Sequence, residues 1–273
     1  MAKETTSAKD ARNAAAAARA AAKAADQARE RKIRIIGGAI VLLVMGGLLA
    51  IPIISGKNKG PDTSSSSAVP TGVSKDTFGV KVGSAWGAPN ADKIPKLQIW
   101  EDFQCPACAQ MEANSGAAIK KLVDAGSVRL ELRPTIFLDA KLSGENITAG
   151  NPDSSKLATM AFGCAVDAGQ EEKFHKAVFA NQPATEGDGF SAALMSKLAQ
   201  DSGITGSALT TFNDCLTSKK YEGWVNNSFD RFSKEGVTST PSGILNGKEI
   251  TGNTLFSPDQ LTKVILDAGK ASK

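Results

Sequence analysis

Two cysteines three positions apart, Cys105 and Cys108, are the side chains of this sequence best suited to covalent chemistry. A buried strand is predicted before the pair and a helix after it, which places Cys105 at a helix N-terminus. The unpaired N–H groups there favour a thiolate and lower its pKa by roughly one unit. Pro106 suits the first helical turn, and Ala107 adds no charge. Because a second thiol one turn along can resolve a mixed disulfide, the pair predicts thiol–disulfide exchange.

Two other roles for the C-x-x-C pair are open. Such a pair is half of a zinc site, whose other half is usually a second close pair of ligands. The remaining candidate ligands, His175, Cys164 and Cys215, each stand alone in the sequence. We therefore expect no metal and no other cofactor. The second alternative is a purely structural disulfide, which would be strained and uncommon within C-x-x-C.

Two carboxylates, Glu101 and Asp102, immediately precede the predicted helix. One of them could lie partly buried beneath Cys108 and relay its proton. For either one taken singly, a solvated carboxylate at a strand end is the simpler expectation. His175 is the single histidine of the chain, and we expect it at the surface or in packing. With one histidine, a hydrolase triad or an H-E-x-x-H metal site is not expected.

A third motif lies far downstream, where Thr240 and Pro241 precede a predicted hairpin. The bond before a proline is where a cis peptide is least unfavourable. A cis proline would free neighbouring backbone groups to pair with an extended substrate, although a Thr-Pro before a strand is usually just a turn. The hairpin itself is signalled by Asn-Gly at 246–247, a type I′ turn pair, between apolar-containing segments 244–245 and 248–250.

Cys164 and Cys215 lie in two separate predicted helical segments. In an oxidising compartment outside the cell they should be paired. A disulfide that closes a loop of about 51 residues stabilises the fold by roughly 4 kcal/mol in the chain-entropy model. The alternative is that they form a second redox pair.

The order of predicted elements indicates an α/β domain with a helical insertion. A strand at 97–103, a helix up to Gly126 and a strand at 128–133 come first, and a hairpin and a helix that starts at Ser257-Pro258 come last. Between them, five helical segments lie in an insertion of about residues 140–235. These segments are 155–168, 171–181, 191–202, 206–218 and 219–235.

The N-terminal part of the chain predicts a membrane anchor. Residues 35–54 are 20 residues without a charge, enough to span a bilayer as a helix. The alternatives are a buried helix or a cleaved signal peptide, but no A-x-A cleavage site follows. Residues 1–34, an Ala-rich tail, hold nine Lys or Arg and four acids, which favours a cytoplasmic N-terminus. A linker rich in Ser, Gly and Pro follows at 55–75, so the domain at 76–273 is expected outside the cytoplasm.

Net charge places few demands on the folded part. The chain carries a formal net charge of +4, and the tail accounts for more than all of it. The remainder is slightly acidic, so the basic character of the chain is no argument for nucleic-acid binding. We expect no nucleic-acid partner.

Taken together, the motifs resemble a known family. Residues 101–108 (Glu-Asp-Phe-Gln-Cys-Pro-Ala-Cys), the helical insertion, the segment 237–241 (Val-Thr-Ser-Thr-Pro) and the Asn-Gly hairpin are similar to the DsbA-like thiol–disulfide oxidoreductases of the thioredoxin superfamily. The resemblance covers roughly residues 76–273. It is greatest to membrane-anchored forms from Gram-positive bacteria, some of which carry an extra disulfide in the helical insertion.

The resemblance implies a thioredoxin-like α/β fold with an inserted all-helical subdomain, preceded by one N-terminal transmembrane helix. It implies that Cys105 is the nucleophile, Cys108 the resolving thiol and Pro241 the cis proline. Pro106, Ala107, Thr240, Glu101 and Asp102 are the supporting residues. One departure is Ala107, because strongly oxidising members often have His at this position. Without that charge the pair is expected to be a weaker oxidant.

The function expected from the resemblance is disulfide donation to reduced or unfolded exported proteins. Reoxidation by a quinone-linked thiol oxidase in the membrane is implied, and we expect a single-pass membrane protein and a monomer. Two alternatives stay open. One is a membrane-anchored reductase or isomerase that a membrane electron donor keeps reduced. The other is a non-catalytic adaptor or holdase with a thioredoxin-like surface.

Overall fold

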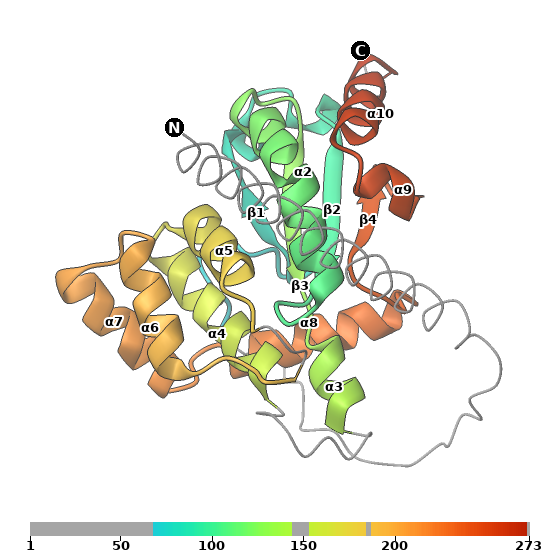
Figure 1. Cartoon of the computed structure of the whole chain (residues 1–273). Coiled ribbons are helices and arrows are strands. Elements are labelled where there is room, and N and C mark those ends of the chain that lie inside the picture. Colours follow the sequence, from blue (N-terminus) through green and yellow to red (C-terminus); the bar gives the residue numbers. More distant parts are fainter. Residues whose placement is uncertain (1–67, 144–152, 184–186, 272–273) are drawn as a thin grey trace, which may run out of the picture. The chain divides into compact units, whose positions relative to one another are not determined.

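A five-stranded mixed sheet is the core of the computed structural model, which describes residues 68–143, 153–183 and 187–271 (Figure 1). The strand order is β1-β3-β2-β4-β5. Strands β2 and β3 are parallel, and the other neighbouring pairs are antiparallel. The strands are β1 (Val80–Val82), β2 (Lys96–Glu101), β3 (Arg129–Pro134), β4 (Ser242–Leu245) and β5 (Lys248–Ile250).

The parallel pair is joined by helix α2 (Pro106–Asp124), the crossover that parallel neighbours require. Its apolar side chains, among them Met111, Ile119 and Leu122, are buried. Gly126 then has a φ of 62°, a left-handed conformation that suits glycine just beyond a helix end. The strand–helix–strand unit predicted from the sequence is confirmed, and it places Cys105 at the junction of β2 and α2.

Between β3 and β4, the described chain forms helices, as predicted for the insertion. Figure 1 shows α4, α5, α6 and α7 gathered on one side of the sheet. The five predicted helical segments correspond to α4–α8, and α3 begins the insertion slightly earlier than expected. The helices are α3 (Phe137–Ser143), α4 (Ser154–Asp167), α5 (Glu171–Ala180), α6 (Ala192–Asp201), α7 (Gly206–Thr217) and α8 (Glu222–Lys234).

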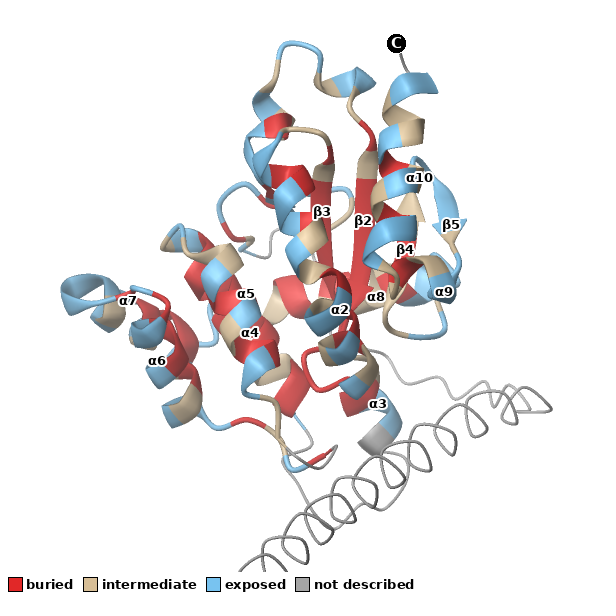
Figure 2. Ribbon diagram, turned by 45° about the horizontal axis from the view of Figure 1, so that its top comes forward, coloured by how far each residue is buried: buried red, intermediate tan, exposed pale blue. Residues whose placement is uncertain are grey.

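Both faces of the central strands are covered, so β2 and β3 are buried along almost their whole length (Figure 2). Ile99 and Leu132 lie on the α2 side of the sheet, and together with residues of α2 they line a groove. On the other side, Trp100 packs edge-on against Phe232 of α8, with ring centroids 5.3 Å apart. Alternate residues of a strand point to opposite faces, so Glu101 lies on the same face as Ile99.

Two charged residues of β3, Glu131 and Arg133, are buried together with the apolar ones. Arg133 stacks on Trp100, 3.8 Å from the ring centroid, and forms a two-pronged ion pair with Glu235 at 2.6 and 3.0 Å. Glu131 accepts a hydrogen bond from Gln98 at 2.8 Å. Each buried charge is therefore compensated, as burial requires.

The C-terminal hairpin and helix complete the sheet as predicted. Asn246 and Gly247 have φ values of 49° and 80°, the pair of left-handed residues that a type I′ turn needs. A short helix, α9 (Gly252–Leu255), follows and was not predicted. Helix α10 (Pro258–Ala271) then begins with Pro258 at its first position, and the Ser257 hydroxyl accepts a hydrogen bond from the Gln260 N–H at 3.5 Å.

The N-terminal end of the described chain contacts both the sheet and the helical insertion. Val73 forms a β-bridge with Val80, and Thr71 bonds to Asp167 of α4. Residues 68–75, assigned to the linker from the sequence, thus make specific contacts with the domain. The tail at 1–34, the expected anchor at 35–54 and most of the linker lie outside the described residues. Within the described part, no helix combines the length and apolar character needed to cross a membrane.

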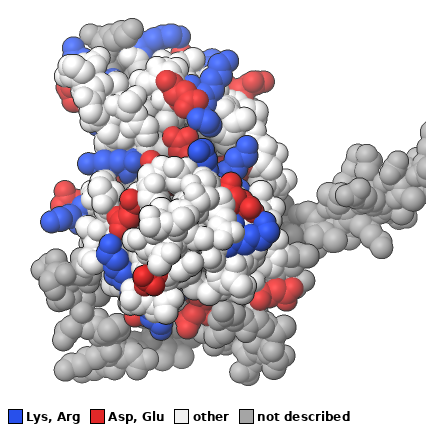
Figure 3. Space-filling model, turned by 90° about the vertical axis from the view of Figure 1, so that its left-hand side faces the viewer, with Lys and Arg blue, Asp and Glu red and all other residues white. Residues whose placement is uncertain are grey.

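Charges are mixed on the face drawn in Figure 3. Lys and Arg side chains lie beside Asp and Glu side chains around an uncharged central area. This face therefore has no broad basic patch of the kind that binds nucleic acid.

Candidate active site

Cys105 and Cys108 lie at the N-terminus of α2 with both thiols free. Cys105 is the N-cap residue and Pro106 starts the helix, as expected. The two thiols differ in access, because Cys105 keeps 7% of its surface exposed whereas Cys108 is fully buried. A partner sulfur approaching from solvent therefore meets Cys105 first.

Several donors favour the thiolate of Cys105 and lower its pKa to about 6. The main cause is a hydrogen bond from the Cys108 thiol. The Thr240 side chain and the backbone N–H groups of Ala107 and Cys108 lower this pKa further, while burial works against them. Cys105 is consequently ionised at neutral pH without a histidine at position 107.

The Cys108 thiol behaves oppositely. Burial, together with the adjacent Cys105 and Glu101 charges, raises the pKa of Cys108 well above its ordinary value. One thiol of the pair is therefore a stable anion and the other a stable neutral donor. When a disulfide between them breaks, Cys108 must take up a proton.

The Thr240–Pro241 segment lies beside Cys105, although it is 135 residues away in sequence. The peptide bond between Thr240 and Pro241 is cis. In the thiol form, the Cys105 sulfur donates to the Thr240 carbonyl oxygen at 3.4 Å. The Thr240 hydroxyl is buried and has no other hydrogen-bond partner. The cis proline expected from the sequence is therefore present, and its segment borders the more accessible sulfur of the pair.

Asp102 is fully buried, so the expectation of a solvated carboxylate is wrong for this residue. Its carboxylate accepts hydrogen bonds from the Gln104 and Leu138 N–H groups, both at 2.9 Å, and from the Ser155 hydroxyl at 2.6 Å. Burial raises the pKa of Asp102 to about 7. These contacts tie the loop before Cys105 to α3 and α4, so Asp102 has a bracing position.

Glu101 is also buried rather than solvated, and its surroundings differ. Its Oε2 atom lies 2.8 Å from Nε2 of His175, while its Oε1 atom is buried without a hydrogen-bond partner. Burial raises the pKa of Glu101 to about 8 and lowers the pKa of His175. At neutral pH the contact is therefore a hydrogen bond between two neutral groups. Glu101 also acts electrostatically on Cys108 and raises the pKa of that thiol.

Glu112 completes a cluster with Glu101 and His175. One ligand atom from each residue lies within 4.8 Å of the others. Burial, and then the Glu101 charge, raise the pKa of Glu112 to about 7. These three side chains come from β2, α2 and α5, and they are the described residues most capable of holding a metal ion. The sequence prediction did not bring them together.

The cluster borders a groove with a volume of about 650 Å³. Its lining includes apolar residues of the sheet and of α2, as well as Glu112 and His175. Around His175, the rings of Phe103, Phe162 and Phe179 lie with centroids 4.9 to 5.7 Å from the imidazole. The histidine is thus held in packing, as one sequence alternative had it, but it also bonds to Glu101.

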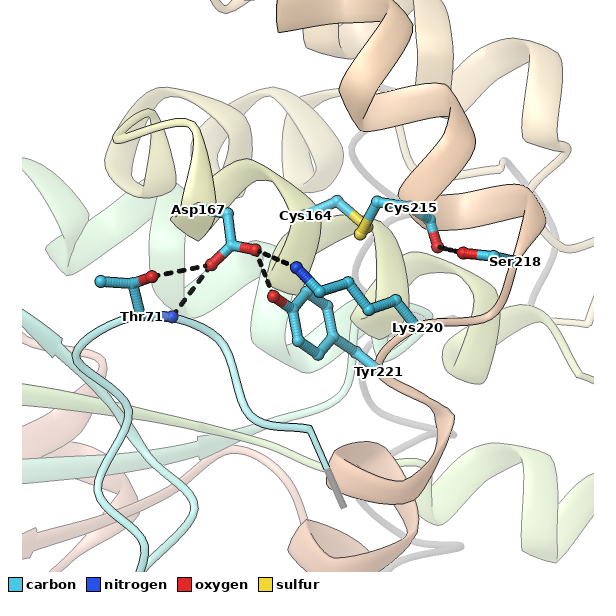
Figure 4. The surroundings of a disulfide bond; sticks show 7 residues. All are labelled: Thr71, Cys164, Asp167, Cys215, Ser218, Lys220 and Tyr221. Atoms are coloured by element: carbon cyan, nitrogen blue, oxygen red, sulfur yellow. Dashed lines mark hydrogen bonds and ion pairs between the residues drawn. A yellow bond between two sulfur atoms is a disulfide. The ribbon is translucent and has the colours of Figure 1, made fainter. Parts of the chain in front are cut away.

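The second cysteine pair joins two helices of the insertion. Cys164 of α4 and Cys215 of α7 form a disulfide with Cα atoms 6.0 Å apart (Figure 4). One turn after Cys164, Asp167 receives hydrogen bonds from Thr71, Lys220 and Tyr221. Figure 4 shows these groups converging on one carboxylate beside the disulfide. The environment is that of a structural clamp between segments.

Glu112 and His175 are the site residues that sequence reasoning missed. Glu112 stands four residues after Cys108 on a predicted helix, so helical spacing alone places it on the same face. That signal was available. His175 approaches from α5 across the fold, and no local pattern indicates that contact.

Comparisons with known proteins agree with this fold. A family model described as Thioredoxin matches residues 80–267. The fold is similar to that of MdbA, a thiol-disulfide oxidoreductase from Actinomyces oris, at 22% identity over 76% of this chain and 96% of that one, with a TM-score of 0.57. No curated protein sequence matches the chain.

Two structures from Mycobacterium tuberculosis are more similar in sequence. The reduced form of DsbG is 28% identical, over 71% of this chain and 91% of that one, with a TM-score of 0.57. Reduced DsbA is 27% identical, over 72% of this chain and 100% of that one, with a TM-score of 0.55. The chain therefore belongs to the thioredoxin family and is a DsbA-like thiol–disulfide oxidoreductase.

Proposed function

We propose that this oxidoreductase works as a disulfide donor for exported proteins, with Cys105 as the exchanging sulfur and Cys108 as its buried partner. The observation that carries the proposal is the asymmetry of the two thiols, a lowered pKa of about 6 at Cys105 against a raised one at Cys108. A stabilised thiolate stabilises the reduced pair, and a pair that is stable when reduced is a strong oxidant.

The first chemical step follows from the difference in access. A client thiolate attacks the Cys105 sulfur, the Cys105–Cys108 bond breaks, and Cys108 leaves as a thiolate. Because Cys108 is buried, that charge must be neutralised, and Glu101 is protonated at neutral pH since its pKa is about 8. Glu101 transfers its proton to Cys108, and solvent later restores it through the groove.

The second step releases the oxidised client. A second client thiolate attacks the client sulfur of the mixed disulfide, a client disulfide forms, and Cys105 leaves as a thiolate. Its low pKa makes it a good leaving group. The client loses two electrons in total, and the Cys105–Cys108 pair gains them.

The client backbone is proposed to lie along Thr240 and Pro241. The support is position, because the Thr240 carbonyl oxygen lies 3.4 Å from the Cys105 sulfur, the more accessible of the two sulfurs. An extended client segment there can pair with backbone groups next to Cys105, as in strand-addition binding.

Although Ala107 stands where strongly oxidising family members often have a histidine, we expect the Cys105–Cys108 pair to be a strong oxidant. The expected weakening from a missing histidine is offset here by the Cys108 thiol, the Thr240 side chain and the backbone N–H groups. The direction of electron flow is therefore proposed as oxidation of clients, with the reductase or isomerase as the competing function.

The setting is proposed from the sequence. The uncharged run at 35–54 anchors the chain, the basic tail at 1–34 stays in the cytoplasm, and the oxidoreductase domain faces outward. A quinone-linked membrane oxidase would reoxidise the pair, and the chain would act as a monomer.

The test is the reduction potential of the Cys105–Cys108 pair in glutathione buffers, on the full chain in mild detergent. A donor should equilibrate near roughly −120 to −180 mV. The matched control replaces Cys164 and Cys215 by Ser, and its potential should be unchanged. A potential near about −270 mV would contradict the proposal and favour a reductase.

A further inference from the structure

We propose that Glu101, Glu112 and His175 form a binding site for a divalent transition-metal ion, for which zinc is the reference ion. The site lies beneath the N-terminal part of α2 and opens to the groove beside α5. An imidazole nitrogen and two carboxylate oxygens lie within 4.8 Å of one another, and the closest pair is 2.8 Å apart. No cysteine sulfur belongs to this group.

The ligand types and spacing suit zinc. Zinc binds imidazole nitrogen and carboxylate oxygen at roughly 2.0–2.2 Å, so ligand atoms around a tetrahedral ion lie about 3.4 Å from one another. The observed separations bracket that value, and small rotations of the side chains would bring all three atoms to it. Three protein ligands leave a fourth position open, and the groove lined by Glu112 and His175 supplies water to it.

An independent observation at Glu101 points to a missing ligand. Its Oε1 atom is buried and has no hydrogen-bond partner. Because only 5% of the side-chain surface is exposed, solvent does not readily replace that partner. Buried polar atoms without partners are uncommon in proteins, and a bound ion is one of their explanations. A divalent cation would also neutralise two buried carboxylates at once.

The three ligands are held by different parts of the fold. Glu101 ends β2, Glu112 lies on α2 and His175 lies on α5. Three phenylalanine rings fix the imidazole from its sides. Ligands placed on packed helices and strands lose little freedom on binding, which is the preorganisation that a metal site needs.

The consequence for catalysis rests on the proposed function, whereas metal binding itself does not. Glu101 coordinated to a cation has no proton to transfer to Cys108. A bound ion would therefore slow the step in which Cys108 leaves, and the oxidoreductase would be inhibited by the metal without any ion on its cysteines.

Binding is tested by titrating the full chain, without a histidine tag, with zinc chloride in a calorimeter. Both Cys105 and Cys108 are replaced by Ser, so that no free thiol competes, and His175 is the chain's single histidine. We expect one saturable ion per chain. Cobalt(II) in place of zinc should give the visible absorption of a site with one nitrogen ligand.

The ligands are tested by Glu112→Gln and His175→Phe, which preserve shape and aromatic packing. Each should weaken zinc binding at least about tenfold, since even outer partners of metal ligands contribute that much. The matched control is Glu172→Gln, a carboxylate of the groove outside the cluster, which should leave binding unchanged. Circular dichroism checks that the variants are folded.

Absence of saturable binding, or equal affinity in the Glu112→Gln, His175→Phe and parent chains, would overturn the site. The catalytic consequence is measured separately, as client oxidation by the chain with both active cysteines and varied zinc. Inhibition that disappears in Glu112→Gln supports it, and undiminished oxidation at saturating zinc overturns it. A chain that oxidises no client even without zinc would refute the proposed function and leave the binding result standing.

Discussion

The two cysteine pairs of this chain contain the same atoms and differ in almost everything around them. Cys105 and Cys108 lie three residues apart at the start of a helix, where hydrogen-bond donors favour a thiolate. Cys164 and Cys215 are 51 residues apart and join two packed helices of the insertion. Reactivity in the first pair therefore comes from the groups that stabilise charge next to one sulfur and deny it to the other. In the second pair, the bond contributes to stability because it closes a long loop of the chain.

The largest difference should appear when each pair is broken. Cys105→Ser removes the exchanging sulfur, and we expect oxidation of a reduced model protein to fall to the uncatalysed rate. The chain with Cys164→Ser and Cys215→Ser should keep that activity at temperatures where it stays folded. Activity is followed by recovery of the model protein's own function. Survival of the activity in Cys105→Ser would show that the comparison assigns the wrong pair.

The structural pair should matter most for stability. Removing it in the double serine variant opens a loop of 51 residues and should lower the free energy of unfolding by about 4 kcal/mol. Urea unfolding at constant pH measures this, with the midpoint and the slope compared with those of the parent chain. A change below about 1 kcal/mol would mean that packing, rather than the covalent link, holds α4 to α7.

Replacing Glu101 and replacing Asp102, the two acids before α2, should also have different effects. Glu101→Gln removes the proton donor, and we expect the step in which Cys108 leaves to slow by about a hundredfold at pH 7. The protonated form of Glu101 is the donor, so the ratio of parent rate to variant rate should decline as pH rises through about 8. Stopped-flow fluorescence during reaction with a thiol peptide follows this step.

Asp102→Asn is the matched control for Glu101→Gln. It replaces a carboxylate that accepts three hydrogen bonds from the loop and the helices beside it. It should lower the free energy of unfolding. The ratio of parent rate to Asp102→Asn rate should not change with pH. A pH-dependent ratio for Asp102→Asn and a flat one for Glu101→Gln would reverse the assignment of the proton donor.

The smallest effect is expected at Thr240, which lies beside Cys105. Thr240→Val removes the hydroxyl that lowers the Cys105 pKa and should raise that pKa by about one unit from its value near 6. The shift is measured by a pH titration of the reduced chain, followed by the ultraviolet absorbance of the thiolate. Thr238→Val, a neighbouring exposed threonine, serves as the control and should leave the titration unchanged.

Most of the fold could be predicted because its signals are local. Helix spacing, the Asn246-Gly247 turn and the Ser257-Pro258 helix start each occupy a few adjacent residues. Strand β1, only three residues long, had no such signal, since it exists through its pairing with β3. The burial of Glu131 and Arg133 was equally invisible, because it depends on contacts with distant parts of the chain, Thr77 and Gln98 at Glu131 and Glu235 at Arg133.

The same division holds at the site. The C-x-x-C pair and Thr240-Pro241 are motifs, and the structure places Thr240 beside Cys105. The burial of Glu101 is different, because it depends on α2 and α5 closing over the end of β2. His175 is a case in which a lone polar residue in a helical segment has no readable role until the contact with Glu101 is seen.

Asp167 gives the molecule a mechanical property. Its carboxylate takes hydrogen bonds from Thr71, near the start of the described chain, and from Lys220 and Tyr221 between α7 and α8, one turn from the Cys164 bond. A pull on the chain from its N-terminal side would therefore be borne partly by a cross-linked group of helices. The β-bridge between Val73 and Val80 would share that tension.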